Sequence, residues 1–141
     1  MKTKYFFIII LIFLQQITFA QWYSLNVPTT GDLLDLWFND ANTGYVIGNF
    51  GKIFKTTDGG ENWSEKNSGT NNVLRSIYFT SHNTGYVCGE AGTVLKTTDG
   101  GDNWTDIFPG ITNFSSIYFV DENLGYLAGS YLELPPGNEY G

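Results

Sequence analysis

The chain has 141 residues, and its 14 acidic side chains outnumber seven basic ones, which gives a formal net charge of −7. An acidic surface repels phosphate backbones, so the composition argues against nucleic acid as a partner. The single cysteine, Cys88, excludes an internal disulfide, and stability must therefore come from a core rich in Tyr, Phe and Trp.

The first twenty residues are typical of a secretory signal peptide. Two lysines precede an apolar run over residues 5–14, and the small residues Thr18 and Ala20 stand where signal peptidase requires them. The apolar run is shorter than the roughly 20 residues that span a bilayer, which argues against a membrane anchor. We expect cleavage after Ala20, export to the periplasm or the extracellular space, and a mature chain without a membrane span.

The mature part of the sequence repeats with a period of 41 residues. Residues 33–72 align with residues 74–113 without a gap, and a third copy begins at residue 114 with a shift of 40. Three tryptophans, Trp22, Trp63 and Trp104, also stand 41 residues apart. Residues 21–31 are therefore predicted to form the last strand of a preceding repeat.

Each repeat carries the signals of four short strands. The first is apolar and aromatic and runs into an Asn/Gly turn, the second begins at a Gly-Tyr pair, and the fourth begins at each tryptophan. The first three strands are expected at 33–38, 45–48 and 52–56, at 74–79, 86–89 and 93–97, and, in the third repeat, at 114–120 and 126–129. Four antiparallel strands in about 41 residues, without helical periodicity, predict an all-β fold of β-propeller blades.

Nearly the same turn sequence follows the third strand in both complete repeats. Residues 56–63 read TTDGGENW and residues 97–104 read TTDGGDNW. This pattern resembles the Asp-box, or bacterial neuraminidase repeat. With the Gly-Tyr-x-x-Gly strand before it, the pattern over residues 22–130 is similar to the propeller family that includes the photosystem II assembly factors. The resemblance implies the fold, but it does not imply photosynthesis, because the same repeat class occurs in secreted proteins of bacteria without photosystems.

Physical chemistry explains the box as a device for closing a turn. Asp58 and Asp99 can accept hydrogen bonds from backbone N–H groups, and the adjacent glycines allow a positive φ. The alternative is that these aspartates are catalytic or bind calcium. Repetition favours the structural role, because a catalytic residue is needed once and a fold residue once per blade. The predicted structural residues are Thr56, Asp58, Gly60, Trp63, Thr97, Asp99, Gly101 and Trp104.

Candidate binding residues are positions that differ between repeats on the first strand or its flanking turn. They are Arg75, Asp35 and Glu90. First strands line the central channel of a propeller, where partners commonly dock. Arg75 is the only arginine in the chain, and it could pair with a carboxylate of a partner. The alternatives are a solvated charge or a pair with Asp35 of the neighbouring repeat.

These features favour a non-enzymatic module that binds a protein or a surface glycan, and a purely structural extracellular repeat is not distinguished from it. The alternative is a glycoside hydrolase of the sialidase type, since those enzymes carry Asp-boxes. A sialidase holds its substrate with an arginine cluster, which a chain with one arginine cannot build. No cofactor and no metal site are expected.

The third repeat loses the pattern after Gly129. Leu132 replaces the turn glycine, Pro135 and Pro136 fall in the expected third strand, and Glu139 stands where the box aspartate would be. The expected organisation is a strand over 21–31, blades over 32–72 and 73–113, and a partial blade over 114–141. Such a propeller of about three blades is part of a longer propeller, or its open edges associate with another copy.

Overall fold

The computed structural model describes residues 22–108, 110 and 112–131, and these residues form three antiparallel sheets. We call the sheets, with their turns, blades 1, 2 and 3. Blade 1 contains β1 (Leu33–Phe38), β2 (Gly44–Gly48), the short 3-10 turn η1 (Asn49–Gly51), β3 (Ile53–Thr56) and β4 (Ser64–Lys66). Blade 2 contains β5 (Leu74–Phe79), β6 (Gly85–Gly89), β7 (Val94–Thr97) and β8 (Thr105–Asp106), and blade 3 contains β9 (Thr112–Phe119) and β10 (Gly125–Tyr131).

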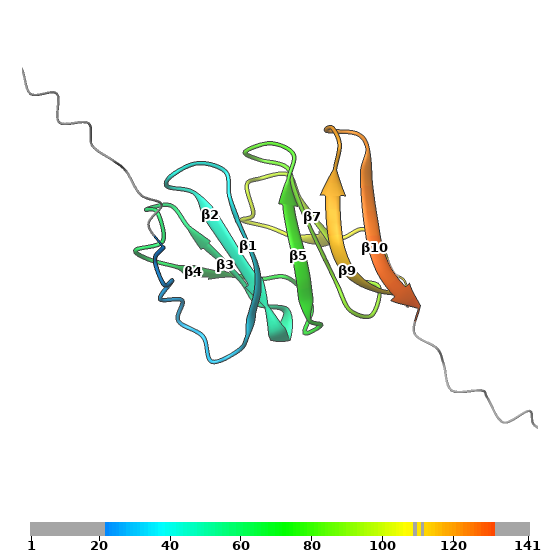
Figure 1. Ribbon diagram of the computed structural model, residues 1–141, viewed down its shortest axis with the longest axis horizontal. Coiled ribbons are helices and arrows are strands. Elements are labelled where there is room, and N and C mark those ends of the chain that lie inside the picture. The colour runs from blue at the N-terminus through cyan, green and yellow to red at the C-terminus, as the bar shows by residue number, and fades with distance from the viewer. Residues whose placement is uncertain (1–21, 109, 111, 132–141) are drawn as a thin grey trace, which may run out of the picture.

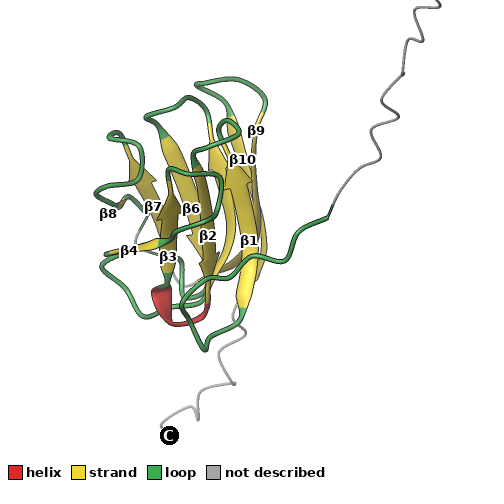
Figure 2. Cartoon of the chain, turned by 90° about the vertical axis from the view of Figure 1, so that its left-hand side faces the viewer, coloured by secondary structure: helices red, strands yellow, loops and turns green. Residues whose placement is uncertain are grey.

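The three blades stand side by side in chain order (Figure 1). Their first strands are neighbours, since β5 contacts β1 on one side and β9 on the other. A quarter turn shows the outer strands β4 and β8 at one edge and the first strands β1 and β9 at the other (Figure 2). The predicted fold class, all-β blades of four antiparallel strands in an incomplete propeller, is confirmed.

The Gly-Tyr pair that opens every second strand has a steric cause. Gly44 pairs with the last residue of β1, Phe38, and a Cβ on this glycine would lie 2.6 Å from the Phe38 ring. Gly85 meets Phe79 of β5 in the same way, again at 2.6 Å. The phenylalanine ring therefore lies flat on the opposite strand, and any side chain at the glycine would displace it.

Blades 1 and 2 share the largest buried cluster. The ring of Tyr45 stacks on Phe79 with the centroids 4.3 Å apart, and Trp104 meets Phe79 edge-on. The Tyr45 hydroxyl donates a hydrogen bond of 2.6 Å to the carbonyl of Gly100 in the next blade. The cluster consists of Tyr45, Ile47, Ile53, Leu74, Ile77, Phe79, Val87, Leu95 and Trp104. Packing across two repeats thus stabilises each blade, as expected of a repeat protein.

Blades 2 and 3 repeat this interface, with Cys88 and Val94 at the positions of Ile47 and Ile53. Tyr86 stacks on Phe119 at 4.5 Å, and the Tyr78 hydroxyl donates to the Phe119 carbonyl at 3.2 Å. Cys88 is fully buried here and packs as a small apolar side chain with Val94, Phe114 and Ile117.

The strand predicted over residues 21–31 is wrong for the described part, residues 22–31, which form no strand. Leu25 and Val27 instead pack on Val46 and Phe54, on the face of blade 1 that points away from blade 2. A lone segment becomes a strand only when it pairs with a sheet edge. Here the backbone closes on itself, with the Thr29 N–H bonded to the Val27 carbonyl at 2.8 Å.

Two sets of sequence expectations lie outside the described residues. One is the signal peptide over residues 1–20 with its cleavage point. The other is the altered end of the third repeat, including Leu132, Pro135, Pro136 and Glu139. Within the described ranges, no helix has the length and the apolar composition needed to cross a membrane.

Candidate functional site

The box of blade 1 closes the turn between β3 and β4 with side-chain hydrogen bonds. Asp58 accepts from the Asn62 backbone N–H at 2.9 Å, from the Asn62 amide at 2.8 Å and from the Thr56 hydroxyl at 2.8 Å. The Thr56 hydroxyl oxygen accepts from the Gly60 N–H at 3.0 Å, and the Trp63 indole donates to the Gly60 carbonyl at 3.0 Å. Gly60 has a φ of 94°, which the turn requires.

Blade 2 contains the same network at the equivalent residues. Asp99 accepts from the Asn103 N–H at 3.0 Å, from the Asn103 amide at 2.8 Å and from the Thr97 hydroxyl at 2.8 Å. Thr97 in turn accepts from the Gly101 N–H at 2.9 Å, and the Trp104 indole donates to the Gly101 carbonyl at 3.2 Å. Thr97 is buried, so the network ties an exposed turn to the core.

Hydrogen bonding to the charged form governs the acidity of both aspartates. The side-chain amide of Asn62, then the backbone N–H of the same residue and the Thr56 hydroxyl, lower the pKa of Asp58 to about 2. Asn103 and Thr97 lower the pKa of Asp99 to about 2 in the same manner. A carboxylate held this firmly in its charged form is a poor proton donor at neutral pH.

The structural role predicted for the eight box residues stays a prediction, which substitution of these aspartates tests.

The turn of blade 2 also receives two cations from blade 1. Asp102 accepts hydrogen bonds from Lys66 at 2.8 Å and from Lys55 at 3.2 Å. The Lys66 side chain first, then Lys55, lowers the pKa of Asp102. The residue equivalent to Lys55 in blade 2, Lys96, lies over the ring of Tyr86, 5.4 Å from its centroid. Blades 1 and 2 are thus joined by charge at the turn as well as by the buried cluster.

The structure separates the three candidate binding residues into two groups. Arg75 forms an ion pair with Glu90 of its own blade, at the exposed end of the first two strands. Asp35 does not join them, because its carboxylate accepts the backbone N–H of Ile77 at 2.9 Å. The alternative pairing of Arg75 with Asp35 is therefore wrong, since a nearer carboxylate and a backbone donor satisfy the two side chains. Within the described residues, no three His, Cys, Asp or Glu side chains are grouped closely enough to hold a metal ion.

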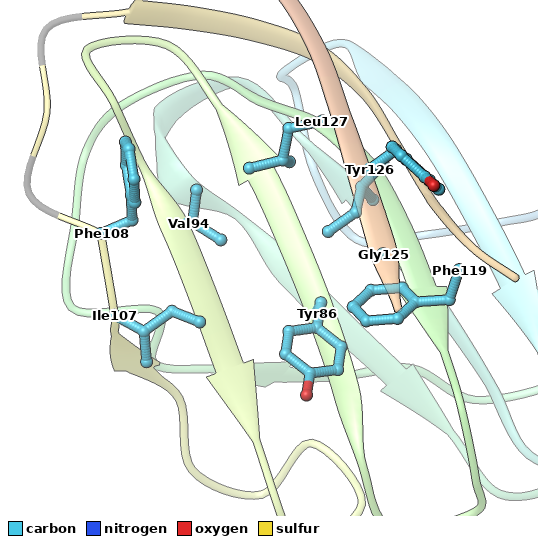
Figure 3. A pocket seen from close by; sticks show the side chains of 9 residues that line it. Tyr86, Val94, Ile107, Phe108, Phe119, Gly125, Tyr126 and Leu127 are labelled. Carbon is cyan, nitrogen blue, oxygen red and sulfur yellow. The ribbon is translucent and has the colours of Figure 1, made fainter. Parts of the chain in front are cut away.

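A hollow of about 200 Å³ lies between blades 2 and 3 (Figure 3). Leu127 points into the hollow, whereas the ring of Tyr126 points away from it, on the other face of β10. The lining is apolar and consists of Tyr86, Val94, Ile107, Phe108, Ile117, Phe119, Gly125, Tyr126 and Leu127.

Repeat equivalence explains this hollow. Between blades 1 and 2 the corresponding space is filled by Leu95 of the third strand and by Trp104 after it. Among the described residues, blade 3 has two strands and supplies neither side chain. The hollow was not predicted from the sequence.

The chain is similar to known proteins along most of its length. Residues 14–110 match the family described as "Photosynthesis system II assembly factor YCF48". A segment of 49 residues is 35% identical to the photosystem II assembly lipoprotein Ycf48 of Synechococcus sp. (strain CC9605), and it covers 35% of this chain and 15% of that protein. A segment of 47 residues is 36% identical to the lipoprotein of the same name in Parasynechococcus marenigrum (strain WH8102), covering 33% and 14%.

Two solved structures share the arrangement of strands. A structure titled "YCF48 bound to D1 peptide" superposes with a TM-score of 0.64 at 27% identity, over 77% of this chain and 37% of that chain. YCF48 from Cyanidioschyzon merolae gives a TM-score of 0.65 at 17% identity, over 75% and 37%, which supports the fold alone. The chain thus spans little more than a third of the solved relatives. Because the family match extends over more than half of its residues, the chain belongs to the family of the photosynthesis system II assembly factor YCF48.

Proposed function

We propose that this protein is an exported, non-enzymatic propeller module that binds another protein and assists its assembly. Family membership is the observation that carries the proposal, since the relatives are described as assembly factors. One solved relative is titled as bound to a peptide, which supports a polypeptide partner over a surface glycan. The partner itself is not implied by the relatives, because this chain spans only part of them.

The exposed ion pair of Arg75 and Glu90 is the proposed contact point. Both side chains remain partly open to solvent, at 42% and 36% exposure. An arginine can exchange a carboxylate of its own chain for one of a partner, and its fork-shaped guanidinium holds such a group with two hydrogen bonds. Arg75 stands on β5, the middle one of the three first strands, so a partner placed there can also reach β1 and β9.

Co-purification from the periplasm or the medium, followed by reconstitution with the purified partner, tests this proposal. We expect Arg75→Gln to weaken binding about tenfold, because a charge-assisted contact is lost. Lys52→Gln is the matched control. Lys52 also forms an exposed ion pair, with Glu65 at 2.5 Å, but it precedes β3 and is not on a first strand. Equal binding by both variants would contradict the assignment of Arg75.

The sialidase-type alternative predicts a different result for the same variant. It requires turnover of a sialoside that disappears with Arg75→Gln, and such turnover would replace the binding proposal. The arginine content argues against this alternative, because a sialidase holds its substrate with a cluster of arginines and this chain has one.

We further propose that export precedes binding. The apolar segment over residues 5–14 and the small residues Thr18 and Ala20 support cleavage after Ala20. Mass spectrometry of the exported protein should find Gln21 at its N-terminus. An exported protein that keeps residues 1–20 would contradict the cleavage.

A further inference from the structure

Each interface between neighbouring blades joins a tyrosine of one blade to a phenylalanine of the next. Tyr45 stacks on Phe79 at 4.3 Å between blades 1 and 2, and Tyr86 stacks on Phe119 at 4.5 Å between blades 2 and 3. The tyrosine is always the second residue of the second strand, and the phenylalanine always stands at the end of the first strand. The interface is therefore directional, with a tyrosine face on one side of every blade and a phenylalanine face on the other.

The two ends of the row present one face of each kind. The tyrosine face of blade 3 carries Tyr126, whose side chain is 59% exposed and points away from blade 2 (Figure 3). The phenylalanine face of blade 1 carries Phe38, which meets Trp63 edge-on at 6.3 Å. Phe79 meets Trp104 in the same way at 6.1 Å, so the aromatic platform that receives a tyrosine is already formed in blade 1.

The rest of the phenylalanine face of blade 1 is apolar and exposed, and the equivalent surface of blade 2 is buried by its neighbour. Leu36 is 53% exposed, whereas the equivalent residue of blade 2, Ile77, is 3% exposed beneath blade 1. Leu33 is exposed, whereas its equivalent Leu74 is fully buried. An apolar hollow lies on this face beside these leucines, lined by Leu25, Leu33, Leu34, Asp35, Leu36 and Val46.

Residue Leu25 occupies the place on blade 1 where a tyrosine would stack. In blade 2, Tyr45 lies so close to the box turn that a Cβ on Gly101 would be 2.6 Å from its ring. In blade 1, a Cβ on the equivalent Gly60 would be 3.3 Å from Leu25. The segment before β1 therefore covers part of the phenylalanine face, and leaves the exposed leucines Leu33 and Leu36 beside it.

We propose that blade 3 of one copy docks on blade 1 of a second copy, with Tyr126 stacking on Phe38 of that copy in place of Leu25. A second copy is the occupant because, at both internal interfaces, a tyrosine face packs on a phenylalanine face. Blade 1 carries an exposed phenylalanine face, so it can receive the tyrosine face of another copy. The contact is heterologous, so one interface uses two different surfaces. The described residues of two copies provide six blades, within the roughly 4–8 of closed propellers. The inference does not rest on the proposed function.

Sedimentation velocity of the exported full chain over a concentration series tests this docking. We expect wild-type protein to associate, and Tyr126→Ser and Leu36→Lys each to raise the dissociation constant at least tenfold. Leu124→Ser is the control, since Leu124 is 46% exposed in the turn between β9 and β10 and lies outside both faces. Acidic side chains outnumber basic ones in each copy, so charge repulsion opposes association and added salt should tighten it.

Mixing experiments and a third variant separate this docking from other contacts. A mixture of the Tyr126 and Leu36 variants should associate more tightly than either variant alone, because one intact interface forms between them. Leu25→Ser should tighten association of the otherwise wild-type chain, because Leu25 competes for the same place.

A wild-type chain that stays monomeric, or association that Tyr126→Ser weakens and Leu36→Lys does not, would overturn the proposal. The second result would indicate contact between two tyrosine faces. Arg75→Gln should leave the association unchanged, which keeps this result separate from partner binding.

Discussion

Tyr45 and Tyr86 occupy equivalent positions but have different surroundings. The Tyr45 ring is fully buried, and its hydroxyl donates to the Gly100 carbonyl at 2.6 Å. Burial, followed by the charge of Asp102, raises the pKa of Tyr45 to about 12. The ring of Tyr86 stacks in the same way, but its hydroxyl forms no hydrogen bond with any described residue. The difference arises because blade 2 supplies a box turn at this place, and the described part of blade 3 does not.

Removing the two hydroxyls should therefore have unequal effects. Tyr45→Phe leaves the Gly100 carbonyl without its partner and should lower the free energy of unfolding by about 1–2 kcal/mol. Tyr86→Phe, the control, keeps the stacked ring and should change stability by less than about 0.5 kcal/mol. Urea unfolding followed by tryptophan fluorescence measures both, and equal losses would show that the inter-blade hydrogen bond contributes little.

The box aspartates should make stability depend on acid. Their pKa of about 2 in the folded protein lies below the ordinary 3.8, so the unfolded chain takes up these protons first as the pH falls. Their contribution is complete above about pH 4 and is lost as the pH falls toward 2. Asp58→Asn combined with Asp99→Asn should lower the melting temperature at pH 7 and flatten the pH dependence in this window.

Thermal unfolding between pH 7 and pH 2 measures this effect. Glu61→Gln is the control, since it removes a charge from the same turn without removing a hydrogen bond to Asp58. A double variant with wild-type melting at every pH would show that the carboxylates do not serve the fold.

The sequence was informative about residues whose partners are local. The hydrogen bonds of Asp58 and Asp99 reach no more than four positions along the chain, so the turn pattern predicts them. The sequence did not predict that Arg75 pairs with Glu90. Both side chains are flexible and stand on different strands of a hairpin, and the repeat alignment offered Asp35 as a second carboxylate. That choice depends on the Ile77 N–H, which holds Asp35 from the neighbouring blade.

Strands were predictable wherever the sequence also contained their pairing partner. β1 and β5 begin and end at the expected residues, because both edges of each hairpin are encoded in one repeat. Residues 22–31 contain Trp22 at the repeat position where a fourth strand begins. Trp22 is nevertheless 93% exposed, whereas its equivalent Trp104 is 9% exposed. A fourth strand pairs with a third strand, as β4 does with β3 and β8 with β7, and among the described residues no strand pairs with residues 22–31.

Equivalent apolar residues of β1 and β5 should differ in their contribution to stability. Leu74 is fully buried between blades 1 and 2, so Leu74→Ala should lower the free energy of unfolding by about 2–5 kcal/mol. Leu33→Ala makes the same change at the exposed equivalent position and should cost about 1 kcal/mol or less. Chemical denaturation gives both values. Similar losses would mean that blade 1 is covered in solution as completely as blade 2.

Across the whole molecule, Cys88 reports whether blade 3 opens separately. The thiol is fully buried between blades 2 and 3, and burial raises its pKa to about 12. Phe114→Ala should accelerate thiol labelling by about tenfold or more, because Phe114 packs in the same cluster. Ile53→Val, in the cluster between blades 1 and 2, is the control and should accelerate labelling much less. Equal acceleration by both variants would indicate that the blades open together.

The pairing of each tyrosine with the phenylalanine of the next blade has a genetic consequence. One repeat unit encodes one tyrosine and one phenylalanine of these stacked pairs, so unequal recombination that adds or deletes a whole unit leaves every junction matched. A point mutation in either aromatic residue damages a junction that its own repeat cannot mend, because the other half is encoded one unit away. Genes of this kind should therefore change in length by whole units more readily than they exchange these aromatic residues.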